Sequence, residues 1–209
     1  MEIITNEMIF TGNAAHIAVT TAGAITADNV QGALQDLDPS GKHTIWIPAV
    51  AMYPSATSGA AWYSGESGPT LKALAFDPDT DEFAEFAIVF PKSWDEGTLT
   101  AQFYWMTAVA ESPAHDISWM IQAKAVGDGS PTAGGFGSAV GVSDTTLNEL
   151  VLRITPETSG MTVGGTPAAG DLVAFKISRD ANAGGDTVAA DGLLLGVKLI
   201  FTTNAVNDD

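Results

Sequence analysis

Apolar and polar residues alternate along most of the chain from His43 onward, which is the pattern of β-strands with one buried face. Thr98–Met106 shows it clearly, with apolar residues at every second position from Leu99 to Trp105. The same pattern predicts about eight strands in all. They are His43–Pro48, Lys72–Phe76, Glu82–Phe90, Thr98–Met106, Ile117–Ala125, Leu150–Ile154, Val173–Ile177 and Leu193–Phe201.

Strands with one apolar and one polar face are typical of two antiparallel sheets that pack face to face. Eight of them favour a mainly β fold, an antiparallel β-sandwich that is jelly-roll-like. Trp105 and Trp119 fall on apolar faces and are expected in the core. Four long connections are expected to cross between the sheets: 54–69, 107–115, 127–143 and 180–191.

The sequence before His43 predicts an extended arm followed by one short helix. Asp28 or Asn29 can cap a helix that runs to about residue 37, because a short side-chain acceptor bonds the free N–H groups of the first turn. A helix of two to three turns is not stable alone, so its apolar stripe packs either on its own chain or on copies of itself. The residues of this stripe, spaced as one helix face, are Val30, Ala33, Leu34 and Leu37.

The predicted organisation is an attachment arm (1–24), a short helix with its linker (25–42), a β-sandwich domain (43–205) and a tail (206–209). The first residues lack the basic and apolar regions of a signal peptide, and no apolar run approaches the ~18 residues that span a bilayer. The chain contains no cysteine, so disulfides and thiolate metal sites are excluded.

The net charge of the chain excludes some classes of binding partner. Acids outnumber bases by 25 to 8, which gives a net charge of −17. Binding to the phosphate backbone of nucleic acid or to an anionic membrane needs lysine and arginine, so neither partner is expected. A strongly negative surface is typical of a protein that stays soluble at high local copy number, with attraction to a basic partner or to divalent cations as the alternative.

The helical segment Ile25–Asp38, which contains Thr-Ala-Asp-Asn-Val-Gln-Gly-Ala-Leu, resembles a spacer of tail-fibre and head-fibre proteins of tailed bacteriophages. There the spacer links an attachment arm to a distal β domain. The rest of the chain is similar to a group of phage virion proteins, and the resemblance implies a trimeric fibre, spike or capsid decoration without catalytic residues. The matching segments are Gly41–Ala49, Phe83–Ile88, Phe90–Trp94 and Gly196–Thr203.

Two patterns suggest chemistry. Asp77, Asp79 and Asp81 have the spacing that opens a Ca²⁺ loop, but the glycine and the final glutamate of such a loop are missing, which favours an ordinary turn over a weak cation site. The three histidines, His16, His43 and His115, lack the spacing of metal ligands.

Aromatic rings can stack on sugars, so the loop residues Trp62, Tyr63 and Trp94 are the candidates for a glycan contact; packing of these loops is the alternative.

We therefore expect a non-enzymatic virion structural protein, located on the virion, with no catalytic, cofactor or metal site. The leading interpretation is a capsid decoration, head-fibre or cement protein, which forms a homotrimer through Val30, Ala33, Leu34 and Leu37 and binds the major capsid protein or another virion protein. The alternative is a tail-fibre or receptor-binding adhesin that recognises a glycan of the host surface through Trp62, Tyr63 and Trp94.

Overall fold

The computed structural model describes residues 41–63, 71–146 and 148–205. The chain divides into two compact units, Met1–Gly41 and Lys42–Asp209, and the strands described below belong to the second. The predicted helix with Val30, Ala33, Leu34 and Leu37 lies outside the described residues. Within the described residues, the helical element is the 3-10 turn η2 (Ala49–Ala51). No helix among these residues is long and apolar enough to span a membrane.

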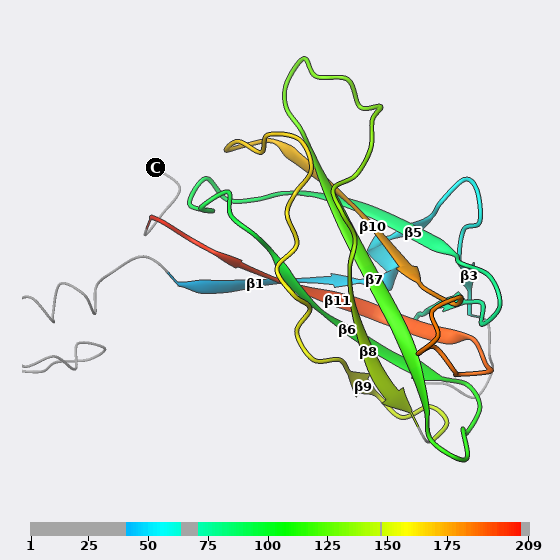
Figure 1. Ribbon diagram of the computed structural model, residues 1–209. Coiled ribbons are helices and arrows are strands. Elements are labelled where there is room, and N and C mark those ends of the chain that lie inside the picture. Colours follow the sequence, from blue (N-terminus) through cyan, green and yellow to red (C-terminus); the bar gives the residue numbers. More distant parts are fainter. Residues whose placement is uncertain (1–40, 64–70, 147, 206–209) are drawn as a thin grey trace, which may run out of the picture. The chain divides into compact units, whose positions relative to one another are not determined.

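Two antiparallel sheets pack face to face (Figure 1). We name each after its central strand. The β11 sheet runs β3 (Ala61–Trp62), β4 (Leu74–Phe76), β11 (Gly192–Thr202), β6 (Thr100–Thr107) and β9 (Arg153–Ile154), and β1 (Lys42–Pro48) also pairs with β11. The β10 sheet runs β2 (Tyr53–Pro54), β5 (Phe83–Val89), β10 (Leu172–Arg179), β7 (His115–Val126) and β8 (Val140–Thr146).

The strand order is that of a jelly roll. From β4 to β11 the chain passes to the opposite sheet at every connection except the one between β7 and β8. This path interleaves two four-stranded sets, β4-β11-β6-β9 in one sheet and β5-β10-β7-β8 in the other, which is the double Greek key of a jelly roll. The predicted fold class is confirmed.

The predicted connections are only partly right. The segments 107–115 and 180–191 contain crossovers between the sheets, as expected. The segment 127–143 does not cross, because it leads from β7 into β8 in the same sheet. The segment 54–69 also crosses as expected, because it leads from β2 in the β10 sheet to β3 in the β11 sheet, although β3 itself was not predicted. The predicted strand Leu150–Ile154 shrinks to the two residues of β9.

The core lies between the sheets and is rich in aromatic side chains. Trp105 and Trp119 are both fully buried, as expected, and their ring centroids lie 6.2 Å apart. Phe103 stacks on Trp119 at 5.6 Å, and the edge of Phe76 meets the same ring at 5.2 Å. The alternation in β6 and β7 therefore sends the predicted faces inward.

A β-bulge in β11 changes which residues face the core. The sequence pattern places Leu193 and Leu195 on the same face as Val197. Instead, the register shifts between Leu194 and Gly196, so that Leu194 and Val197 are in the core and Leu193 and Leu195 pack on the outer face. One extra residue in a strand reverses the alternation beyond it. The outer face of the β11 sheet thereby gains its own apolar cluster: Ala73, Ala75, Met106, Leu193 and Leu195.

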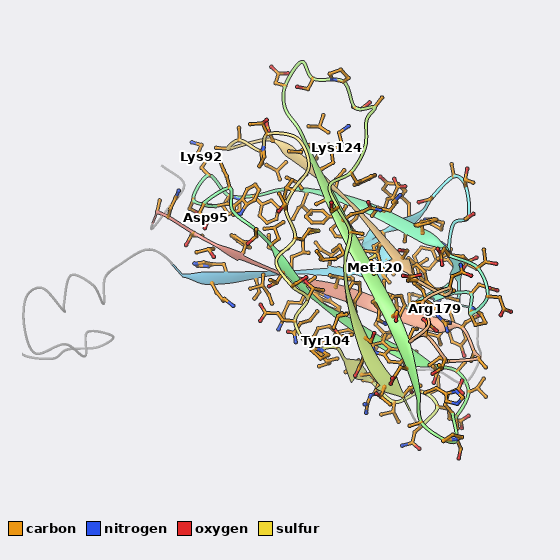
Figure 2. The ribbon with its side chains drawn as sticks, in the orientation of Figure 1. Lys92, Asp95, Tyr104, Met120, Lys124 and Arg179 are labelled. Atoms are coloured by element: carbon orange, nitrogen blue, oxygen red, sulfur yellow. The ribbon has the colours of Figure 1, made fainter. Side chains whose placement is uncertain are left out.

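A buried ion pair holds the crossover from β10 to β11. Arg179 is 0% exposed, and its Nη2 lies 2.7 Å from Asp186 Oδ1. The guanidinium also donates to the carbonyls of Phe76, Val188 and Ala190, which satisfies a charge that would otherwise be costly to bury. Figure 2 marks Arg179 near one end of the sandwich.

Candidate functional site

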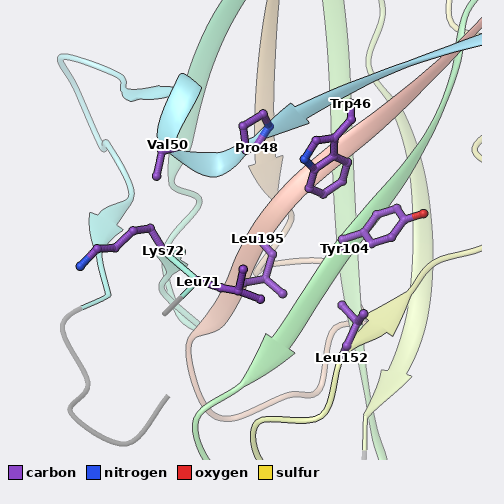
Figure 3. A pocket seen from close by; sticks show the side chains of 8 residues that line it. All are labelled: Trp46, Pro48, Val50, Leu71, Lys72, Tyr104, Leu152 and Leu195. Carbon is purple, nitrogen blue, oxygen red and sulfur yellow. The ribbon is translucent and has the colours of Figure 1, made fainter. Parts of the chain in front are cut away.

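The outer face of the β11 sheet carries an open pocket of about 350 Å³ (Figure 3). A neighbouring pocket of about 430 Å³ shares Val50 and Lys72 with it. We call the two together the aromatic groove. Its lining residues are Trp46, Pro48, Val50, Trp62, Tyr63, Leu71, Lys72, Tyr104, Leu152 and Leu195.

Trp46 and Tyr104 form one wall of the groove. In β1, Ile45 and Ile47 pack toward the core, so the residue between them points outward. The indole of Trp46 and the ring of Tyr104 meet edge to face, with centroids 4.8 Å apart and planes at 73°. Even with this contact Trp46 is 46% exposed, so much of its ring surface is available to a ligand.

Trp62 and Tyr63 lie at the other end of the groove, where the sequence analysis placed candidate glycan contacts. Trp62 lies on the short edge strand β3 and is 46% exposed. The Tyr63 backbone N–H donates to the carbonyl of Ala73 at 3.1 Å, which ties this end to the strand of Leu74. The ring of Tyr63 packs against the outer apolar cluster.

The prediction that Trp94 contacts a glycan is wrong. Trp94 is only 3% exposed, and its ring packs against Phe90 with centroids 4.5 Å apart. A buried indole cannot stack on a sugar, so Trp94 leaves the glycan candidates. Trp46 and Tyr104, conversely, were not among the contact residues predicted from the sequence. The signal for Trp46 was present, because the neighbouring Ile45 and Ile47 assign the opposite face to the residue between them.

Lysines flank the aromatic groove. Lys72 lines both of its pockets. Lys198 is the register partner of Trp46 across β1 and β11, so it lies on the same face of the sheet. Lys42 begins β1 on this face, where its Nζ lies 3.5 Å from Glu157 Oε1. A hydrogen bond from Thr100, helped by Lys42 and Lys198, lowers the pKa of Glu157.

On the outer face of the β10 sheet, Lys124 and Lys176 contact groups of their own chain. Lys124 Nζ donates to the carbonyls of Thr132 and Ala133, both at 2.9 Å, and so holds the loop after β7 (Figure 2). Lys176 Nζ lies 4.7 Å from the ring centroid of Phe83 and 5.3 Å from that of Phe136. Lys124 and Lys176 are therefore already engaged by groups of their own chain.

The acidic turn after β4 has the contacts of a turn. The Asp77 backbone N–H donates to Glu82 at 2.9 Å, and the Asp79 backbone N–H donates to Asp77 Oδ1 at 2.8 Å. Burial raises the pKa of Glu82, and the charges of Asp77 and Asp191 add to the increase. In the described part of the chain, no group of three or more His, Cys, Asp or Glu residues is placed to hold a metal ion.

The two described histidines lie apart. His43 begins in β1 and tilts against Phe201, with ring centroids 5.8 Å apart. His115 begins β7 in the other sheet, and its Nδ1 lies 3.0 Å from Glu111 Oε2. His16 lies outside the described residues. The structure thus gives His43 and His115 separate packing roles.

The fold and the groove define a jelly-roll domain with an exposed aromatic surface. No family model and no curated protein matches the chain. Among solved structures, it is similar to a family 11 carbohydrate-binding module from Clostridium thermocellum in complex with a β-1,3-1,4-mixed-linked tetrasaccharide. The identity is 14%, the TM-score 0.34, and the match covers 81% of this chain and 91% of that one.

Two further likenesses are of the same order. A carbohydrate-binding module that recognises mannan has 12% identity and a TM-score of 0.37, over 76% of this chain and 98% of that one. A chain of infectious bursal disease virus, Gx strain, has 11% identity and a TM-score of 0.33, over 90% of this chain and 37% of that one. At these TM-scores the likenesses assign no function, and the architecture is compatible with a glycan-binding or a structural role.

Proposed function

We propose that the chain is a non-enzymatic structural protein of a phage virion, and that its jelly-roll domain is an attachment module that binds through the aromatic groove. The observation that carries the attachment role is the pair of half-exposed tryptophans, Trp46 and Trp62, in one apolar groove. Contiguous exposed apolar surface marks interaction sites, and tryptophan and tyrosine dominate their binding energy. The sequence resemblance of Ile25–Asp38 supports the virion part of the proposal.

Within this proposal the partner is another virion protein, and the domain acts as a capsid decoration or head fibre that stabilises the particle. Immunogold electron microscopy of intact particles, with an antibody raised against residues 43–205, tests it. Label spread over the head supports a decoration. Label confined to the tail makes the chain a fibre component instead. Particles without any label contradict the virion proposal altogether.

A second candidate function is glycan binding, favoured by one specific observation. Trp46, Tyr104 and Trp62 expose aromatic rings along a groove, with Lys72 between them, and aromatic faces stack on the apolar faces of sugar rings. Titration of the protein with host polysaccharide, read by tryptophan fluorescence, tests this function. A shift in emission that Trp62→Ala reduces and Trp94→Phe leaves intact supports it, since Trp94 is buried. Emission that is unchanged by every polysaccharide contradicts it.

A further inference from the structure

Four basic residues form no ion pair, hydrogen bond or cation–π contact within the described residues: Lys72, Lys92, Arg153 and Lys198. Arg179 is paired with Asp186, Lys42 with Glu157, and Lys124 with two carbonyls. Lys72 and Lys198, in contrast, form no ion pair or hydrogen bond within the described residues. Both lie on the outer face of the β11 sheet.

The position of Lys72 and Lys198 beside the groove bears on its ligand, because basic residues are few in this acidic chain. With a net charge of −17, the protein as a whole repels anions. At physiological salt, however, charges are screened beyond about 8 Å, so contact binding depends on the local groups. The basic groups nearest the groove are Lys72 and Lys198, one toward each end of its aromatic wall, and the acidic Glu157 near Lys198 is already paired with Lys42.

Aromatic and lysine side chains follow one another along the outer face of the β11 sheet. Going along β11 from Lys198 toward Leu193, the neighbouring groups on this face are Trp46, then Tyr104 opposite Gly196, then Leu195. Lys72 and Trp62 follow in the adjoining pocket. An aromatic ring therefore lies next to a lysine at each end of the groove, and the two pairs share one continuous surface.

We propose that the aromatic groove binds an acidic polysaccharide, a sugar chain that carries carboxylate or phosphate groups. Trp46 and Trp62 stack on the sugar rings, while Lys72 and Lys198 pair with the anionic groups. The exposed rings offer faces for sugar stacking, and the unpaired ammonium groups beside them complement the anionic groups of such a ligand. This inference rests on the glycan-binding function proposed above and names its ligand class.

The test uses the full-length chain and two matched probes. Oligogalacturonate carries a carboxylate on every sugar, and its methyl ester has the same rings without the charge. An array that holds other uronic-acid, sialic-acid and phosphate-bearing polysaccharides beside neutral ones identifies the best ligand, which is then titrated by calorimetry. We expect binding to acidic chains only, with affinity that falls as salt is raised.

Three variants locate the site. Lys72→Gln and Lys198→Gln are expected to weaken binding about 3- to 10-fold each, and Trp46→Ala about 10-fold or more. Lys92→Gln is the control, because it changes the net charge equally but Lys92 does not line the groove. Circular dichroism verifies that each variant is folded.

The outcomes separate the two proposals. If neutral chains bind as well as acidic ones, or if both lysine variants bind like the wild type, the acidic-ligand inference is wrong while glycan binding stands. If nothing on the array binds, both are wrong. If Trp46→Ala changes the sedimentation of the protein and not its ligand binding, the groove is a contact with a second copy, which also overturns the inference.

Discussion

The indole of Trp46 lies directly on the backbone of Gly196, with no room for a side chain between them. A Cβ at residue 196 would come within 2.5 Å of indole atoms Cη2 and Cζ2 and within 2.6 Å of the Ile47 carbonyl oxygen. Gly196 follows the β-bulge, so the same irregularity that places Leu195 on the outer face also puts the glycine beneath Trp46. The wall of the aromatic groove depends on this contact.

Gly196→Ala should therefore displace Trp46 and destabilise the domain. Overpacking of this kind costs about 1–3 kcal/mol. The carbonyl oxygen of Ile47 belongs to the backbone of a paired strand, so it cannot move aside as the end of a flexible side chain does. Urea unfolding measures the loss, and tryptophan emission reports the displaced ring. Gly184→Ala is the matched control, because no atom lies within 4 Å of its Cβ. Equal stability of the two variants would refute the packing argument.

Arg179→Met should be among the most damaging substitutions. It leaves the Asp186 carboxylate buried without its cation, and removing one partner of a buried pair costs about 3–5 kcal/mol. Arg153→Met, in the half-buried edge strand β9, should cost about 1 kcal/mol or less. Thermal unfolding of both variants compares them. A similar melting temperature for the two would contradict the assigned role of Arg179.

Glu82 and Glu157 should affect the pH dependence of stability with opposite sign. Burial raises the folded-state pKa of Glu82, so its charged form opposes folding above that pKa, and the cost disappears as the pH falls through it. The pKa of Glu157 is lowered, so its contribution is present above the unfolded-state pKa and is lost as the pH falls through the folded-state pKa.

At pH 7, Glu82→Gln should therefore raise the free energy of unfolding, and Glu157→Gln should reduce it. Both differences should shrink toward acidic pH, where the wild-type carboxyls are protonated. Urea titrations between pH 7 and pH 3 measure the two profiles. Two profiles that shift in the same direction at pH 7 would show that one of the pKa assignments is wrong.

The five tryptophans should fall into two accessibility classes. Trp46 and Trp62 are half exposed, whereas Trp94, Trp105 and Trp119 are buried. Acrylamide is expected to quench the first pair strongly and to leave the emission of the other three largely intact. Trp46→Phe should remove mainly quenchable emission, and Trp94→Phe mainly protected emission. The reverse assignment would place the groove on the wrong face.

Much of the fold follows from alternation alone, because strands such as β6 and β7 bury every second residue. Alternation failed where backbone geometry departs from it. The bulge before Gly196 sends Leu193 and Leu195 to the outer face, which no period-2 pattern anticipates. Strand β8 was missed because its outward positions hold glycine and serine, so only Val140 and Val142 mark it as a strand.

The site was predictable only in part. Trp62 and Tyr63 were found because they interrupt a loop rich in small residues. Trp94 was misassigned because a loop position in sequence does not reveal burial, and here the ring packs on Phe90. Tyr104 could not have been paired with Trp46 from sequence, since their contact depends on the order in which β1, β11 and β6 lie side by side.

The pairing of β1 with β11 determines how the domain carries mechanical load. All seven residues of β1, Lys42 to Pro48, pair in register with the central strand β11. A pull on the chain at Lys42, resisted by a ligand held on other strands of the sheet at Trp62 and Lys72, acts along β1. Such a force strains the hydrogen bonds of β1 together instead of opening them one after another. An anchor at this end would therefore shear the domain, which is the direction in which a paired strand resists best.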